Sequence, residues 1–288
     1  MNDNPMVAQN APAKKSIINI DEVFRKKGGK LYPFIPKFII SYLKRVIHQD
    51  ELNDALDKYE NKTGLDFIGS ILTERFTVDI EVKNPHNIPA HGRYIIASNH
   101  PLGGLDGMAL MHVVGKKRKD IKFIVNDILL ELKNLNVLFV PVNKHGRNSI
   151  ESVKIIENLY ESDDLVLIFP AGLVSRKQKG GIIKDLHWKK SFISKAIKHK
   201  RDIIPVYIEG RNSSFFYNLA RWRKMMGIKG NIEMLYLPDE MFKQADKKMT
   251  ITFGKPLPYT MFTKSKTHNQ WAQWVKEKAY ELAAEPSI

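Results

Sequence analysis

The chain has 288 residues, 43% of them hydrophobic, no cysteine and a formal net charge of +15. These features allow a large core but exclude a disulfide framework, a thiolate metal site and a cysteine nucleophile. No basic segment followed by an apolar one opens the chain, and no run approaches the roughly 18 apolar residues that cross a bilayer, so we expect a cytoplasmic protein without a signal peptide or membrane span.

The first quarter of the chain differs in pattern from the rest. Residues 1–15 are polar and contain Asn, Ala, Pro and Lys, which predicts a disordered lead. Residues 16–75 contain two helical patterns, and the first of them, within residues 31–48, places aromatic and basic side chains on one helix. Such a face suits the boundary between water and lipid, but it also suits a helix packed on the main domain. We predict a helical, membrane-associating appendage over residues 16–75.

From residue 76 onward, short apolar runs alternate with helical patterns. Seven runs predict strands: 77–82, 94–97, 121–125, 137–140, 165–169, 203–208 and 249–253. Helical patterns lie between many of them, for example at 149–160 and 187–200, and a last one at 269–284 is expected to dock on the domain. This order predicts an α/β domain over residues 76–288 with a mixed, mostly parallel sheet flanked by helices.

A glycine-rich turn after the second run carries a histidine and a carboxylate. Residues 98–107 read Ser-Asn-His-Pro-Leu-Gly-Gly-Leu-Asp-Gly. A carboxylate fixes the tautomer of an imidazole and stabilises the imidazolium, so His100 with Asp106 can act as a general base. Gly103 and Gly104 can adopt positive φ and bring the two groups together. Asp106 also stands where the N-cap of the following helix is expected.

Three further segments follow in the chain. Residues 137–147 are an apolar strand leading to two basic residues. Residues 169–177 read Phe-Pro-Ala-Gly-Leu-Val-Ser-Arg-Lys, and residues 203–206 read Ile-Ile-Pro-Val. In this order, the His turn and these segments resemble the four motifs of the glycerolipid acyltransferases, the lysophosphatidate-acyltransferase-like superfamily. The glycine-rich first motif is similar to a bacterial, haemolysin-like branch that includes O-acyltransferases of aminolipids such as ornithine and glycine lipids.

Two positions depart from the family pattern. Five residues lie between His100 and Asp106 where the family has four, and Ala171 stands where the family usually has Glu. In the family this glutamate is usually associated with the glycerol-phosphate end of the acceptor. Its replacement therefore favours an aminolipid carboxylate over lysophosphatidate.

The resemblance implies that His100 and Asp106 are catalytic and that basic residues hold the anionic end of the acceptor. The candidate substrate-binding residues are Lys144, Arg147, Gly172, Ser175, Arg176 and Lys177. Gly172 permits close approach of the backbone, and Arg176 offers a planar, charged fork that fits carboxylate or phosphate. Whether Lys144 or Arg147 fills the basic position of the second motif stays open.

Positive charge is concentrated after the third motif. Between Arg176 and Arg201 ten Lys or Arg residues stand against the single acid Asp185, a net charge of +9. Such a stretch attracts phosphate, anionic lipid or an acidic protein, or is a solvated helix face. Asp185 is expected to cap the basic helix that begins near His187. The aromatic and basic pattern at 213–226 fits headgroup depth in a membrane or a helix packed on the core.

We predict an O-acyltransferase, peripheral on the inner face of the cytoplasmic membrane, that acts on a lyso-lipid hydroxyl. The expected co-substrate is acyl carrier protein or acyl-CoA, and a lyso-aminolipid is preferred as acceptor, with lysophosphatidate close behind. No metal and no acyl-enzyme are expected, because neither His-Glu-x-x-His nor Gly-x-Ser-x-Gly occurs. No cofactor and no nucleic-acid partner are expected either. The alternatives are a non-catalytic protein that binds anionic membranes or nucleic acid, and a hydrolase whose dyad activates water.

Overall fold

The computed structural model describes residues 18–28, 35–142 and 150–284. The chain divides into two compact units, residues 1–58 and residues 59–288, which are described one at a time.

The described part of the first unit is helical, as predicted. Its helices are α1 (Ile20–Gly28), α2 (Lys37–Ile47) and α3 (Gln49–Lys58). α2 ends at Ile47, and the left-handed backbone of the next residue, His48 (φ 55°), leads the chain directly into α3. On α2, Phe38 is 72% exposed and Tyr42 is 45% exposed, so these two aromatic residues of the predicted appendage are accessible. The disordered lead predicted over residues 1–15 lies outside the described residues.

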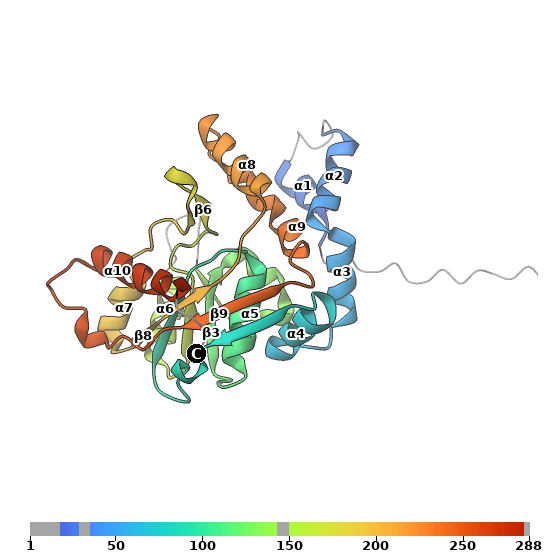
Figure 1. The fold of residues 1–288 in the computed structure, drawn as a ribbon. Coiled ribbons are helices and arrows are strands. Elements are labelled where there is room, and N and C mark those ends of the chain that lie inside the picture. Colours follow the sequence, from blue (N-terminus) through green and yellow to red (C-terminus); the bar gives the residue numbers. More distant parts are fainter. Residues whose placement is uncertain (1–17, 29–34, 143–149, 285–288) are drawn as a thin grey trace, which may run out of the picture. The chain divides into compact units, whose positions relative to one another are not determined.

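The second unit is built on a seven-stranded sheet with the order β1-β9-β8-β2-β5-β3-β4 (Figure 1). The strands are β1 (Asp79–Lys83), β2 (Tyr94–Ser98), β3 (Ile121–Asn126), β4 (Phe139–Val142), β5 (Leu165–Ile168), β8 (Asp202–Ile208) and β9 (Lys248–Phe253). The five strands from β8 to β4 run parallel, whereas β9 is antiparallel to β8 and parallel to β1. The predicted mixed, mostly parallel sheet is confirmed, and each of the seven predicted strands is present.

The central strands are apolar on both faces because helices cover both sides of the sheet. Ile95 and Ala97 of β2 share one core with α6, α7 and α10, while Ile96 between them points to the opposite face. All three side chains are fully buried. Runs of this kind are typical of parallel strands enclosed on both sides.

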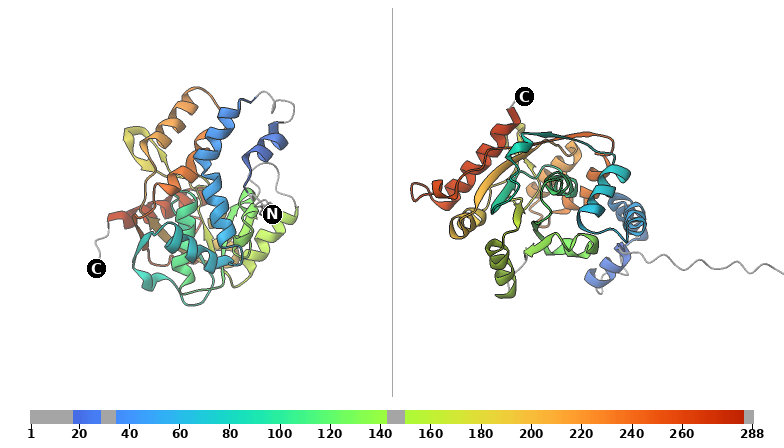
Figure 2. Two further views of the ribbon diagram at one scale, coloured as in Figure 1. Left: turned by 90° about the vertical axis from the view of Figure 1, so that its right-hand side faces the viewer. Right: turned by 90° about the horizontal axis from the view of Figure 1, so that it is seen from below.

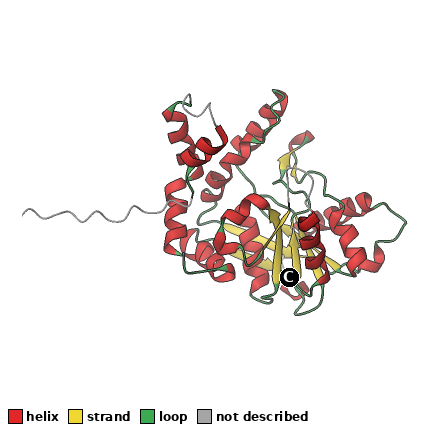
Figure 3. Cartoon of the chain, turned by 180° about the vertical axis from the view of Figure 1, so that it is seen from behind, coloured by secondary structure: helices red, strands yellow, loops and turns green. Residues whose placement is uncertain are grey.

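The helices of the second unit form layers on the two faces (Figures 2 and 3). They are α4 (Gly64–Ser70), α5 (Gly104–Gly115), α6 (Ile150–Glu161), α7 (Ser191–His199), α8 (Ser214–Met225), α9 (Leu237–Phe242) and α10 (His268–Glu281). α6, α7 and α10 lie on one face, and α5, with α4 packed on it, lies on the other. α8 leaves the carboxyl end of β8 and projects away from the sheet, beside a hairpin of β6 (Arg176–Lys177) and β7 (Ile183–Lys184) (Figure 1).

The segment around residue 75 belongs to the second unit. α4 continues into a π-helical turn, η2 (Ile71–Arg75), and both elements lie within residues 59–288, although we assigned them to the appendage. None of the helices within the described residues is long and apolar enough to cross a bilayer.

Candidate functional site

The predicted histidine and carboxylate lie side by side at the carboxyl end of β2. His100 Nδ1 is 3.0 Å from Asp106 Oδ1 and 3.1 Å from Asp106 Oδ2. Gly103, with a φ of 99°, accommodates the extra residue of the turn. The same carboxylate accepts the N–H of Leu102 at 2.8 Å and of Gly103 at 3.3 Å. The contact on which the general-base prediction depends is therefore present.

Asp106 is not the N-cap of the following helix, and that prediction was wrong. α5 begins at Gly104, so Asp106 occupies the third position of its first turn. The positive φ of Gly103 turns the chain early, and the helix therefore starts three residues before the expected Gly107. In the first turn the carboxylate is close to the unpaired N–H groups and the positive end of the helix dipole, where a negative charge is stabilised.

The imidazole of His100 is held between two motifs. Its ring stacks on Phe169, which follows β5, with the ring centroids 4.0 Å apart and an angle of 17° between the planes. The His100 side chain is 17% exposed and that of Asp106 is fully buried. Because Asp106 engages Nδ1 and no described residue bonds Nε2, Nε2 is the ring atom able to accept a proton from a ligand.

Asp185 joins the His100 turn to the third motif. Its Oδ1 accepts the Ser175 hydroxyl at 2.6 Å and the His100 N–H at 3.2 Å, and its Oδ2 accepts the Trp188 indole N–H at 2.8 Å. The Ser175 N–H donates to the His100 carbonyl at 2.7 Å. Asp185 is fully buried, and this burial raises the pKa of its carboxyl. It is therefore not the cap of the basic helix that we expected, and α7 begins only at Ser191.

Two asparagines fasten the same turn to the end of β8. Asn99 donates to the Ile208 carbonyl at 2.8 Å and accepts the Ile208 N–H at 2.7 Å, which is a paired bond to one residue. Asn212 donates to the Pro101 carbonyl at 3.2 Å. Both asparagines are 2% exposed. His100 thus lies between Asn99, which is bonded to the last residue of β8, and Pro101, which is bonded to Asn212 after β8, so its backbone position is well determined.

The remaining predicted substrate-binding residues have different surroundings. Gly172 has a φ of 66° and donates its N–H to the Phe169 carbonyl at 3.0 Å, so this N–H is not available to an anion. Ser175 is buried and donates its hydroxyl to Asp185, while Lys177 is exposed on the hairpin. Lys144 and Arg147 lie outside the described residues.

Arg176 is engaged inside the protein. Its guanidinium lies 2.9 Å from Glu233 in η7 (Ile232–Tyr236), and Arg223 reaches the same carboxylate at 2.8 Å. Glu233 is fully buried, and burial lowers the pKa of Arg176 while Glu233 opposes that change. Arg176 also donates to the Val174 carbonyl at 2.8 Å. These contacts use the fork that we assigned to the acceptor, so the structure brings Arg176 to Glu233 and not to an open site.

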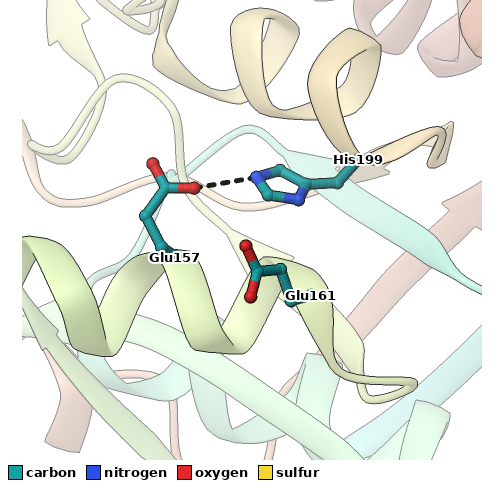
Figure 4. A group of neighbouring side chains, drawn as sticks. All are labelled: Glu157, Glu161 and His199. Carbon is teal, nitrogen blue, oxygen red and sulfur yellow. Dashed lines mark hydrogen bonds and ion pairs between the residues drawn. The ribbon is translucent and has the colours of Figure 1, made fainter.

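One group of side chains within the described residues has the spacing of metal ligands (Figure 4). It consists of Glu157, Glu161 and His199, whose ligand atoms lie within 4.8 Å of one another. The Glu157 carboxylate already pairs with the ammonium groups of Lys195 and Lys198 and accepts from His199 Nε2 at 2.9 Å. These hydrogen bonds, with that of Lys195 the largest, lower the pKa of Glu157 to about 2. The lysines supply the positive charge that a cation would bring, so the group is an ion-pair network between α6 and α7.

Comparison with known proteins adds a family to this geometry. A family model described as Acyltransferase matches residues 22–286. Two relatives named lyso-glycine lipid O-acyltransferase, from Bacteroides thetaiotaomicron and Phocaeicola vulgatus, are 49% and 48% identical over 267 residues. The aligned regions cover 92% of this chain and 97% and 95% of the relatives. The crystal structure of the 1-acyl-sn-glycerophosphate acyltransferase PlsC from Thermotoga maritima is similar with a TM-score of 0.46 and 20% identity, covering 78% of this chain and 81% of that one.

Proposed function

This chain belongs to the acyltransferase family, within the glycerolipid acyltransferase superfamily that its four motifs predict, and from that premise we propose that it acylates the hydroxyl of lyso-glycine lipid. The names of both relatives support this acceptor, and Ala171 in place of the usual glutamate is consistent with it. Lyso-ornithine lipid and lysophosphatidate are the competing acceptors. The single observation that carries the proposal is the His100–Asp106 contact at 3.0 Å.

The proposed reaction uses His100 as a general base. Nε2 takes the proton of the acceptor hydroxyl while its oxygen attacks the carbonyl carbon of the acyl thioester. The new ester C–O bond replaces the C–S bond, and the departing thiolate receives the proton from the imidazolium. Asp106 keeps the proton on Nδ1 and offsets the charge that develops on the ring. Acyl carrier protein or acyl-CoA supplies the thioester. The phosphate groups of either donor are negatively charged, which suits a chain with a net charge of +15.

Transfer with a panel of acceptors tests the proposal. The purified chain is incubated with labelled acyl carrier protein or labelled acyl-CoA, together with lyso-glycine lipid, lyso-ornithine lipid or lysophosphatidate. We expect acylated lipid with the highest kcat/KM for lyso-glycine lipid. Loss of thioester at one rate with and without acceptor would identify a hydrolase. Absence of both reactions would favour a non-catalytic binding protein.

The proposal includes docking on an anionic membrane, at the inner face of the cytoplasmic membrane. Beyond the carboxyl end of β8, the end of α8 and the neighbouring hairpin form what we term the α8–hairpin surface. Its exposed apolar residues are Ile182, Trp222, Met225, Met226 and Ile228. Its exposed cations are Lys177, Lys179, Arg221, Lys224 and Lys229. Rings and thioethers that enter the acyl boundary, with cations on the phosphates, are typical of interfacial helices.

Vesicle binding tests the α8–hairpin surface. Trp222→Glu with Met225→Glu changes two side chains that are 63% and 74% exposed, so little stability should be lost. We expect binding to phosphatidylglycerol vesicles to weaken by at least about tenfold, because two apolar anchors are removed. The matched control is Ile150→Glu with Val153→Glu on α6, which has the same spacing and also replaces exposed residues. Equal binding by both double variants would assign membrane contact to another surface.

A further inference from the structure

The acceptor proposed above carries a carboxylate, but Arg176, the cation predicted to bind it, is already paired inside the protein. Arg176 is paired with the buried Glu233, which also holds Arg223. Ala171, at the position where the family usually has an acid, offers no charge and is 6% exposed. A carboxylate that is moved out of water at this site needs a cation or several N–H donors to replace its hydration. A carboxylate acceptor therefore requires another cation at the third-motif turn.

Lys189 is anchored directly on that turn. Its N–H donates to the Pro170 carbonyl at 3.1 Å. The preceding residue, Trp188, is fully buried and bonded through its indole to Asp185. These two contacts fix the backbone of Lys189, although its side chain is exposed.

The ammonium group of Lys189 lies over Gly172. A Cβ atom placed on Gly172 would be 3.2 Å from Lys189 Nζ, so the absent side chain leaves room for the ammonium beside the backbone. Gly172 closes a tight turn with Phe169 through the 3.0 Å hydrogen bond described above. Because Phe169 stacks on the His100 ring, one short turn carries both the support of the general base and the contact with this ammonium.

Lys189 is also available to a ligand. Within the described residues it makes no ion pair or side-chain hydrogen bond. Lys276, another lysine near Asp185, donates to the Asp185 carbonyl at 2.7 Å and to the Leu186 carbonyl at 3.0 Å. Lys177 lies out on the hairpin, among the cations of the α8–hairpin surface. Of these three lysines, Lys189 alone combines a fixed backbone, a position at the third-motif turn and an unused charge.

We propose that Lys189 binds the carboxylate of the acceptor over Gly172 and thereby selects lyso-lipids with a carboxylate headgroup. This inference rests on the proposed function and specifies its acceptor site. The ammonium supplies a charge-assisted hydrogen bond to one carboxylate oxygen, which holds the headgroup while the lipid hydroxyl faces His100 Nε2. Lys189 is a binding residue in this scheme and takes no part in proton transfer.

Lyso-glycine lipid and its methyl ester provide the test, because they differ only in the negative charge. Both are presented in the same mixed micelles to the wild type, Lys189→Ala and Lys189→Arg. For Lys189→Ala we expect the KM of the acid to rise by about tenfold to hundredfold, as loss of one hydrogen bond to a charged group implies, with kcat changed by less than about twofold. The KM of the ester should stay the same. Lys189→Arg should recover part of the preference for the acid.

Lys190→Ala is the matched control, since it removes the same charge from the neighbouring exposed position. It should leave the preference for the acid unchanged, which separates a local contact from a general field effect. The proposal is overturned if the wild type uses acid and ester with equal KM, or if Lys189→Ala raises both KM values alike, and in either case the proposed acyl transfer still stands. Absence of transfer to both lipids by the wild type would instead remove the proposed function, and this inference with it.

Discussion

Replacing His100 with alanine is expected to lower acyl transfer by about 10²–10⁴-fold, the range that a positioned general base contributes. The imidazole is the only group on the His100 turn that can accept the hydroxyl proton at neutral pH, because the Asp106 carboxylate is fully buried behind it. The measurement is kcat/KM for lyso-glycine lipid at saturating acyl thioester. Binding of the variant to phosphatidylglycerol vesicles should match that of the wild type.

A second histidine, at the end of the helix that follows the His100 turn, provides the control. His112 lies in the last turn of α5, whereas Asp106 lies in the first. His112→Ala removes an equal ring and should retain transfer within about twofold, as expected of a substitution away from the reacting groups. If His100→Ala kept wild-type activity while remaining folded, the assignment of the general base would be wrong.

Asp106→Asn tests the second member of the pair without removing its structural bonds. The amide oxygen can still accept the N–H groups of Leu102 and Gly103, which now bond Oδ2 at 2.8 and 3.3 Å. The amide NH₂ then faces His100 Nδ1 and donates to it, so the ring proton moves to Nε2 and the base is lost. Transfer should fall by about 10²-fold or more with an unchanged melting temperature. Full activity would show that Asp106 serves only to accept the N–H groups of the turn.

The sheet was predictable from sequence because its strands are buried on both faces. The run at 165–169 and the strand β5 (Leu165–Ile168) nearly coincide. A short continuous aliphatic run between two helical patterns is typical of a strand that is buried on both faces. The region of α4 and η2 was harder to assign. Its residues pack on α5, and a helical pattern alone does not tell which partner it buries against.

The site was predictable where it depends on neighbours in sequence and less so where it depends on distant ones. His100 and Asp106 are six residues apart on one turn, so glycine chemistry was enough to place them together. Arg176 pairs with Glu233, which is 57 residues away, and the sequence around Arg176 does not predict that ion pair. Arg176 was therefore predicted to be a free cation. Its position in a basic stretch suggested an exposed side chain, whereas Arg176 is buried.

Asp185 was missed as a site residue for the same reason. Beside a basic stretch, an isolated acid is most simply read as a helix cap, but its partner Ser175 is ten residues away and His100 is 85 residues away. The three donors on its two oxygens come from the first motif, the third motif and the segment before α7. A fully buried carboxylate with that arrangement positions the two turns relative to each other.

Asp185→Asn is expected to lower kcat by about 10²-fold, a loss typical of small misplacements of reacting groups. An amide has one oxygen and one NH₂, whereas the carboxylate accepts from the Trp188 indole on Oδ2 and from His100 and Ser175 on Oδ1. The NH₂ must therefore face an N–H donor in either orientation, unless the turn moves. Steady-state kinetics should show the loss in kcat, with the KM of the thioester changed by less than about threefold.

A control aspartate separates positioning from general stability. Asp202 accepts the Tyr259 N–H at 2.9 Å at the start of β8, the end of the sheet away from His100. Asp202→Ala, which removes the acceptor of the Tyr259 N–H, and Asp185→Asn should both lower the melting temperature, but only Asp185→Asn should lower kcat. Ser175→Ala removes one donor to Asp185 and leaves the other two, so its kcat should fall in the same direction by about tenfold, the value of one hydrogen bond to a charged group. If kcat followed the melting temperature across these three variants, Asp185 would act only through the stability of the fold, because a positioning residue changes the rate of the folded enzyme.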